Sequence, residues 1–130
     1  MAVGGILTLT GCSLGADEEP QRATGPPAEI AAVVQRLERA TAQHDWKTVC
    51  AELFTAAARE RAGGPGCARL LREAAAGVRR PEIEIRGIRV REGGRASVDV
   101  RTRAAGQEAV SDVLELRDED GEWRVEALTG

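Results

Sequence analysis

Several side chains that commonly build active and binding sites are scarce in this sequence. Tyrosine is absent, and the 130 residues include one histidine, one lysine, one phenylalanine and two tryptophans. A single histidine excludes a metal site built from several imidazoles, and so few aromatic rings leave little surface on which a base could stack. The sequence therefore predicts a core of aliphatic side chains.

Neither sign of charge dominates the chain. Its net charge is −3, charged residues make up 30% of it and apolar residues 42%. This balance is typical of one globular domain and argues against wholesale disorder. No basic stripe interleaved with aromatic residues occurs along the sequence, so we expect no nucleic-acid partner.

A short apolar run near the N-terminus ends in the motif Leu9-Thr10-Gly11-Cys12. The run is shorter than the roughly 18 apolar residues that a membrane-spanning helix needs. The motif resembles the signal of bacterial lipoproteins, in which the cysteine takes a diacylglyceryl group and the chain is cleaved just before it. The resemblance implies that Cys12 is lipidated and holds the protein on the extracytoplasmic face of the cell membrane. The alternative is a chance cysteine in a tail.

The residues around Cys12 suggest how the chain is divided. Residues 1–11 resemble the remnant of a signal peptide, and because they contain no basic residue we expect the start of the chain to lie upstream. Residues 12–27 are rich in Gly, Pro and acidic side chains, which is typical of a flexible tether behind the lipidated cysteine. Residues 28–130 form the predicted domain.

Two further cysteines, Cys50 and Cys67, remain once Cys12 is lipidated. An extracytoplasmic location would place this even number in a compartment where disulfides persist, so we expect them to pair. A bridge of this separation stabilises a domain by roughly 3 kcal/mol. The alternatives are two free buried thiols, or a metal-binding or redox pair.

Apolar residues at helical spacing predict four helical segments in the first half of the domain. Pro26-Pro27, Asp45 and Thr55 supply the signals that begin the first three. The expected segments are residues 26–43, 46–54, 56–62 and 67–78.

After Pro81 the apolar period changes to two, which predicts strands joined by short turns. The expected strands are residues 83–90, 96–101, 108–117 and 123–127. A one-residue slip at Arg86-Gly87 predicts a bulge in the first of them. The fold class is therefore α+β, with N-terminal helices packed on one face of a curved four-stranded antiparallel sheet.

Several segments in this order resemble the NTF2-like superfamily, which has a cystatin-like α+β fold, and in particular small uncharacterised lipoproteins of GC-rich bacteria. The segments are residues 32–46, 50–55 with Cys67, 93–98 and 120–125, and the resemblance covers about residues 28 to 128. It implies that helices and sheet enclose a cone-shaped cavity. In that family the cavity serves binding, serves isomerase or dehydratase chemistry, or is packed shut.

No constellation of residues predicts a catalytic site, a cofactor or a metal centre. His44 and Asp45 are adjacent at a helix junction, so their side chains point in different directions, and we expect an exposed histidine beside an N-cap. Asp99 and Asp112 could act as inward carboxylates, but alternation with their apolar neighbours predicts that both lie on the solvent face of the sheet.

Three functions therefore stay open. The leading hypothesis is a non-catalytic, lipid-anchored domain that binds an envelope protein or a small apolar ligand, with Trp46, Phe54 and Trp123 as candidate pocket lining. The second is an isomerase- or dehydratase-type enzyme that uses the cone cavity, and the third is an accessory subunit of an envelope complex. An inward carboxylate or histidine would favour the enzyme, and a dry apolar cavity the binding domain.

Overall fold

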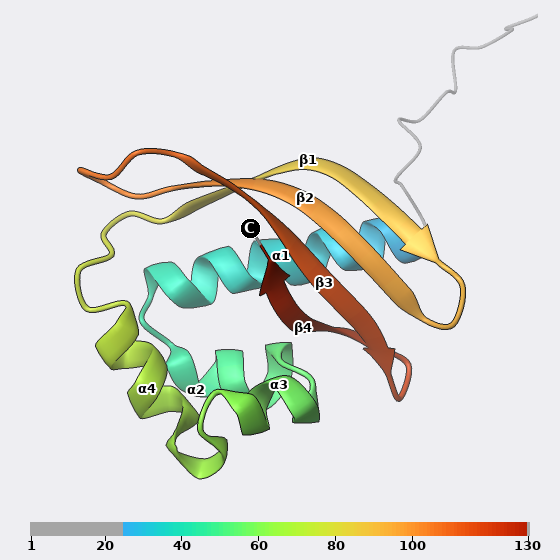
Figure 1. The fold of residues 1–130 in the computed structure, drawn as a ribbon, viewed down its shortest axis with the longest axis horizontal. Helices are drawn as coiled ribbons and strands as arrows, with labels where there is room; N and C mark the ends of the chain where they lie inside the picture. Colours follow the sequence, from blue (N-terminus) through green and yellow to red (C-terminus); the bar gives the residue numbers. More distant parts are fainter. Residues whose placement is uncertain (1–24, 130) are drawn as a thin grey trace, which may run out of the picture.

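A computed structural model of the chain describes residues 25–129. Cys12, the predicted signal remnant and most of the predicted tether lie outside these residues. The helices come first and the strands follow, as Figure 1 shows. The helical elements are α1 (Pro26–Ala42), α2 (Trp46–Thr48), the π-helix η1 (Val49–Leu53), α3 (Ala56–Arg61), the 3₁₀ turn η2 (Gly64–Gly66) and α4 (Cys67–Ala74). The strands are β1 (Glu82–Arg91), β2 (Arg95–Arg103), β3 (Val110–Glu119) and β4 (Glu122–Thr129).

The helices begin where the sequence places their start signals. Pro26 and Pro27 occupy the first positions of α1, where a missing N–H costs nothing. The Asp45 carboxylate accepts a hydrogen bond from the Thr48 N–H at the start of α2, and the Thr55 hydroxyl accepts one from Ala58 N–H at the start of α3. These side chains satisfy backbone donors that a helix leaves free in its first turn.

Two helical predictions need correction. The segment expected to be one helix from Trp46 to Phe54 is a single α-turn followed by a π-helix, which closes with a bond from Phe54 N–H to Val49 C=O. The last helix ends at Ala74 and not at Val78, because the amides of Ala76 and Val78 bond to carbonyls three residues back. Spacing of apolar residues does not distinguish these tighter or wider turns from an α-helix.

The four strands form one open antiparallel sheet in the order β1-β2-β3-β4. The expected bulge in β1 is confirmed, since the register shifts between Ile85 and Gly87. A second register shift, between Glu115 and Leu116, inserts an extra residue into β4. The fold class is thus confirmed as α+β with an open sheet, whereas closure into a cone is not confirmed.

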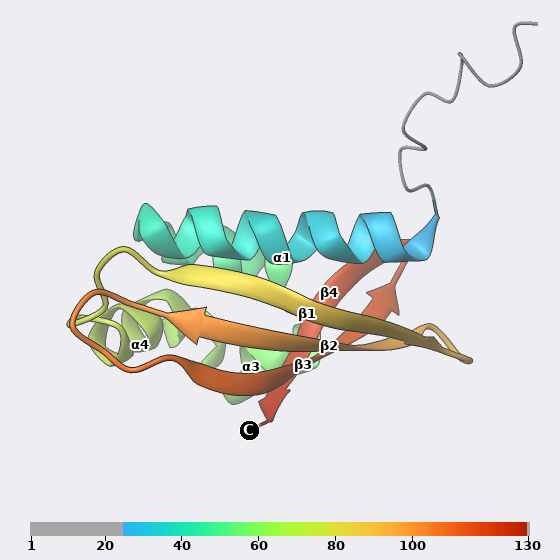
Figure 2. The ribbon, with the colours of Figure 1, turned by 90° about the horizontal axis from the view of Figure 1, so that it is seen from above.

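The helices pack on one face of the sheet. Figure 2 shows α1 running along the sheet beside β1. The helix α4 lies at the end of the sheet where β1 begins. Ile30 and Val34 of α1 pack against fully buried side chains of the sheet, such as Val98 and Leu116. A second cluster, formed by Ala40, Trp46, Val49 and Leu53, lies between α1 and the shorter helices.

A disulfide joins Cys50 in η1 to Cys67 at the start of α4, which confirms the expected bridge. Both residues are buried, with 6% and 1% of their surface exposed. The bridge therefore fixes α4 against the helix that carries Cys50. Among residues 25–129, no helix combines the length and the apolar character required to cross a bilayer.

Candidate functional site

An apolar groove of about 500 Å³ lies where the short helices meet the C-terminal part of the sheet. Its volume falls within the range typical of small-molecule pockets. Leu37 of α1, Leu71 of α4 and Leu114 of β3 contribute apolar side chains from three separate elements. The remaining lining residues are Thr41, Trp46, Val49, Phe54, Ala58, Arg61, Ala62, Val125, Glu126, Ala127 and Leu128.

The groove opens beside the end of β4, where Leu128 is 60% exposed. Leu128 pairs with Leu114, which is only 4% exposed, so the apolar lining runs from the core to the surface along one cross-strand pair. A leucine this exposed at the mouth of an apolar groove leaves hydrophobic surface in contact with water.

Polar groups are confined to a few positions on the lining. The Glu126 carboxylate accepts a hydrogen bond of 2.5 Å from the Thr55 hydroxyl and forms an ion pair of 3.6 Å with Arg61. Arg61 also donates to the Glu126 carbonyl. Because Glu126 is the extra residue at the β4 register shift, its side chain leaves the alternation of the strand and reaches the start of α3. This carboxylate already has two partners.

Trp46 and Phe54 line the groove, as the sequence predicted for them, but Trp123 does not. Trp123 is 8% exposed and packs in the cluster between α1 and the sheet, because its register opposite Asp118 places it beyond the groove. The three aromatic residues are therefore divided between two sites.

The indole N–H of Trp46 has no hydrogen-bond acceptor among residues 25–129, although the side chain is only 6% exposed. A buried donor without an acceptor costs about 1–3 kcal/mol. The neighbouring His44 ring lies 6.0 Å away between centroids and is exposed.

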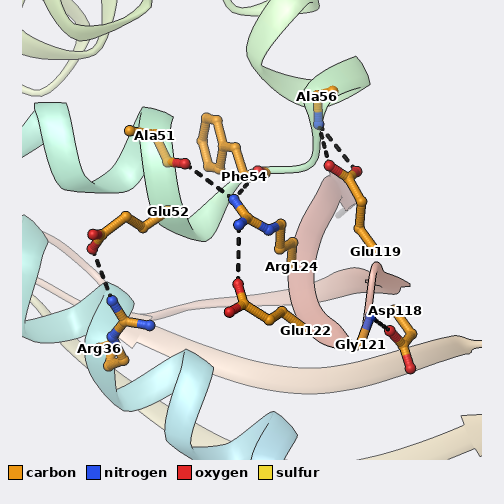
Figure 3. Close-up of polar contacts among 10 residues, drawn as sticks. All are labelled: Arg36, Ala51, Glu52, Phe54, Ala56, Asp118, Glu119, Gly121, Glu122 and Arg124. Carbon is orange, nitrogen blue, oxygen red and sulfur yellow. Dashed lines mark hydrogen bonds and ion pairs between the residues drawn. The ribbon is translucent and has the colours of Figure 1, made fainter.

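A network of polar contacts fixes the π-helix and α3 to the hairpin of β3 and β4 (Figure 3). Arg124 of β4 donates to the carbonyls of Ala51 and Phe54, at 3.0 and 3.4 Å, and pairs with Glu122 at 3.0 Å. The Glu119 carboxylate accepts from the Ala56 N–H, at the start of α3.

Backbone contacts reinforce this network. The Thr55 N–H bonds to the Val125 carbonyl, and Phe54 forms a parallel bridge with Val125. The contacts hold Phe54 and Val125, two lining residues, in fixed positions. The groove wall is consequently rigid where the π-helix meets the sheet.

The other candidates from the sequence lie apart from the groove. Asp99 lies on the solvent face of the sheet and pairs with Arg89 at 3.3 Å. Asp112 was expected on that face too, but it faces Val100 across the strands and shares the face of Leu114, because residues two apart in a strand point to the same side. The part of the chain that the structure describes holds no cluster of metal-ligating side chains.

Arg61 and Glu126 are the groove residues that the sequence reasoning missed. Glu126 sits in a strand whose alternation assigns it to the solvent face, and only the bulge brings it to the groove. Two residues, an even number, separate the apolar positions Val125 and Leu128, and this break in the alternation is the one sequence signal that could have indicated the bulge.

Comparison with known proteins identifies the fold but no family. The chain matches no protein-family profile and no curated protein. It is similar to the solution structure of a SEC-C motif containing protein from Rhodopseudomonas palustris, with a TM-score of 0.60, 17% sequence identity and coverage of 76% of each chain. At this identity the similarity concerns the fold alone.

The family resemblance drawn from the sequence is therefore wrong. The solved structure described above is a SEC-C motif containing protein with a distinct fold, and the sheet here is open, so neither the NTF2-like superfamily nor its small lipoproteins are supported. Each matching segment, such as the hairpin at residues 93–98, is a common α+β feature. Their order along the chain therefore did not identify a family.

Proposed function

We propose that this domain is a non-catalytic binding module that holds a small, mainly apolar ligand in the groove between the short helices and β4. The observation that carries the proposal is the groove itself, whose lining is aliphatic and aromatic apart from Thr41, Arg61 and Glu126. Pockets that bind small molecules have this composition, with a few polar groups that orient the ligand.

The polar groups of the groove support binding over proton transfer. A general acid or base needs a proton or lone pair free for the substrate. Glu126 is engaged by Thr55 and Arg61, and His44 is exposed and does not line the groove. We therefore propose that the site binds without catalysis.

The disulfide supports a location outside the cytoplasm, since such bridges persist in oxidising compartments. We propose an extracytoplasmic location, with acylation of Cys12 as the means of attachment to the membrane. Intact mass of the full chain from its native membrane tests this part independently, because an acyl group and a disulfide each change the mass. A chain without an acyl group would contradict the attachment and leave the groove proposal standing.

Binding in the groove is tested with the neutral fluorophore Prodan, whose emission shifts to shorter wavelength in apolar surroundings. Ala62 lines the groove at the end of α3, so Ala62→Trp should fill part of it and weaken Prodan binding by about tenfold, the effect of losing one well-packed apolar contact surface. Ala57→Trp is the matched control, because Ala57 is exposed on the same helix and does not line the groove. Equal binding by the two variants, with unchanged melting, would contradict the proposal.

A further inference from the structure

Four arginines lie opposite one another across all four strands at one end of the sheet. Arg91 of β1 pairs with Arg95 of β2, Arg95 with Arg117 of β3, and Arg117 with Arg124 of β4. Their neighbours Ala96 and Leu116 are buried on the helix side. The arginines therefore lie on the face of the sheet opposite α1, and of the four only Arg124, on the edge strand β4, reaches the π-helix beside the groove.

Only Arg124 has partners that account for its position. It donates to two backbone carbonyls and pairs with Glu122. Arg91, Arg95 and Arg117 are exposed, and none of them forms an ion pair or side-chain hydrogen bond with residues 25–129. We call these three residues the arginine row.

The arginine row is unfavourable for the isolated sheet. Like charges directly opposite each other on neighbouring strands destabilise the pair, and the row contains two such pairs. Two carboxylates on this face form ion pairs with other arginines, Asp99 with Arg89 and Glu122 with Arg124, and Glu115 accepts a hydrogen bond from the Ser97 hydroxyl. A row that costs stability and has no partner within the described chain indicates a bound anion.

The surroundings of the row limit the kind of anion. Glu92 and Asp120, in the two turns at this end, are exposed and carry negative charge, so the row is a small basic spot and not part of a broad basic surface. Trp46 and Trp123 are buried, and Phe54 lies in the groove, so this face offers no aromatic ring for base stacking. A compact oxyanion fits these constraints better than a long nucleic acid.

We propose that Arg91, Arg95 and Arg117 bind a phosphate group. Neighbouring strands are about 5 Å apart, so the three guanidinium groups can converge on one tetrahedral oxyanion and each can donate two hydrogen bonds to it. A phospholipid headgroup and a soluble phosphate ester share this chemistry. Both views place the turn between β1 and β2, which Arg91 and Arg95 flank, at the end of the domain where α1 begins (Figures 1 and 2).

The test compares two sources of phosphate with the full chain. Inorganic phosphate is titrated while backbone amide shifts are recorded, and sedimentation is measured with vesicles of phosphatidylcholine, with and without phosphatidylglycerol. The triple variant Arg91→Gln, Arg95→Gln, Arg117→Gln should bind at least about tenfold more weakly, because charge-assisted hydrogen bonds are lost. The control carries Arg39→Gln, Arg69→Gln and Arg72→Gln, which remove the same charge from exposed helix positions.

If the row variant, but not the control, loses binding to inorganic phosphate, the proposal is supported and the ligand is a soluble phosphate. If it loses binding to the anionic vesicles instead, the proposal is supported and the ligand is a lipid headgroup. Equal loss in both triple variants would show that binding follows net charge alone and would overturn the proposal, as would the absence of binding in both arms. The variant should melt no lower than the wild type, because it removes like-charge pairs, and this keeps unfolding from imitating a loss of binding. None of these outcomes depends on the groove.

Discussion

At the scale of single residues, Asp45 shows how one side chain positions a residue that lines the groove. Its carboxylate accepts from the Thr48 hydroxyl at 2.7 Å and from the Thr48 N–H at 3.2 Å. These hydrogen bonds fix the first turn of α2, which carries Trp46 into the groove wall. The hydrogen bond from the Thr48 hydroxyl, and next that from the backbone, lower the pKa of Asp45.

We predict that Asp45→Asn reduces the pH dependence of stability. A lowered pKa in the folded state means that the carboxylate stabilises the fold above its ordinary pKa, and that this contribution is lost as the pH falls through the folded-state value. Asparagine still caps the helix but cannot ionise. The wild type should melt higher than the variant at neutral pH, and the difference should shrink in strong acid.

Glu108→Gln, in the exposed loop before β3, removes the same charge away from any helix and is the control. If the melting temperatures of the wild type and Asp45→Asn differ by the same amount from neutral to strongly acidic pH, the role given to the carboxylate is contradicted.

Sequence reasoning succeeded for residues whose roles are local. Asp45 and Thr55 were identified as N-caps because capping needs only a short polar side chain before a helix. Trp123 was misplaced because the choice between two clusters on one sheet face depends on the register of β4, and a sequence pattern does not specify register.

At the scale of elements, the π-helix η1 connects the disulfide, the groove and the sheet. It carries Cys50, its first residue Val49 lines the groove, and Arg124 binds the Ala51 carbonyl. π-Helices occur often at functional sites. The sequence predicted helical structure here but not its width, because the apolar residues sit at spacings that both helix types satisfy.

Arg124→Met should loosen this junction. The substitution keeps the apolar stem but leaves the Ala51 and Phe54 carbonyls without their donor. The Arg124 side chain is 22% exposed, and at such a site its hydrogen bonds contribute about 2 kcal/mol in total to the free energy of unfolding. We expect a lower midpoint of urea unfolding and faster amide exchange in η1 and α3.

Arg117→Met is the matched control, since Arg117 faces Arg124 on the next strand and has no partner among residues 25–129. It should leave the urea midpoint unchanged or raise it. Equal destabilisation by the two substitutions would show that the arginine stems, and not the bonds to the π-helix, hold the junction.

At the scale of the whole molecule, the two proposed sites lie on opposite faces of the sheet. The sequence predicted an α+β fold from a change of period at Pro81, and it predicted the bridge between Cys50 and Cys67. It did not predict the arginine row, whose members are separated along the chain and meet only through the register of three strands. It named Trp46 and Phe54 as candidate pocket lining, but it did not predict the other residues of the groove, which elements from α1 to β4 contribute.

The central claim is that a small apolar ligand binds in the groove, and the two tryptophans allow a direct test. Trp46 lines the groove and Trp123 lies in the other core cluster, so the full chain has two indole N–H signals, one in each place. Titration with Prodan, followed by ¹H–¹⁵N correlation spectra assigned with Trp46→Phe and Trp123→Phe, should move the Trp46 signal and leave the Trp123 signal in place. Movement of both signals together, or of neither while Prodan binds, would contradict the account.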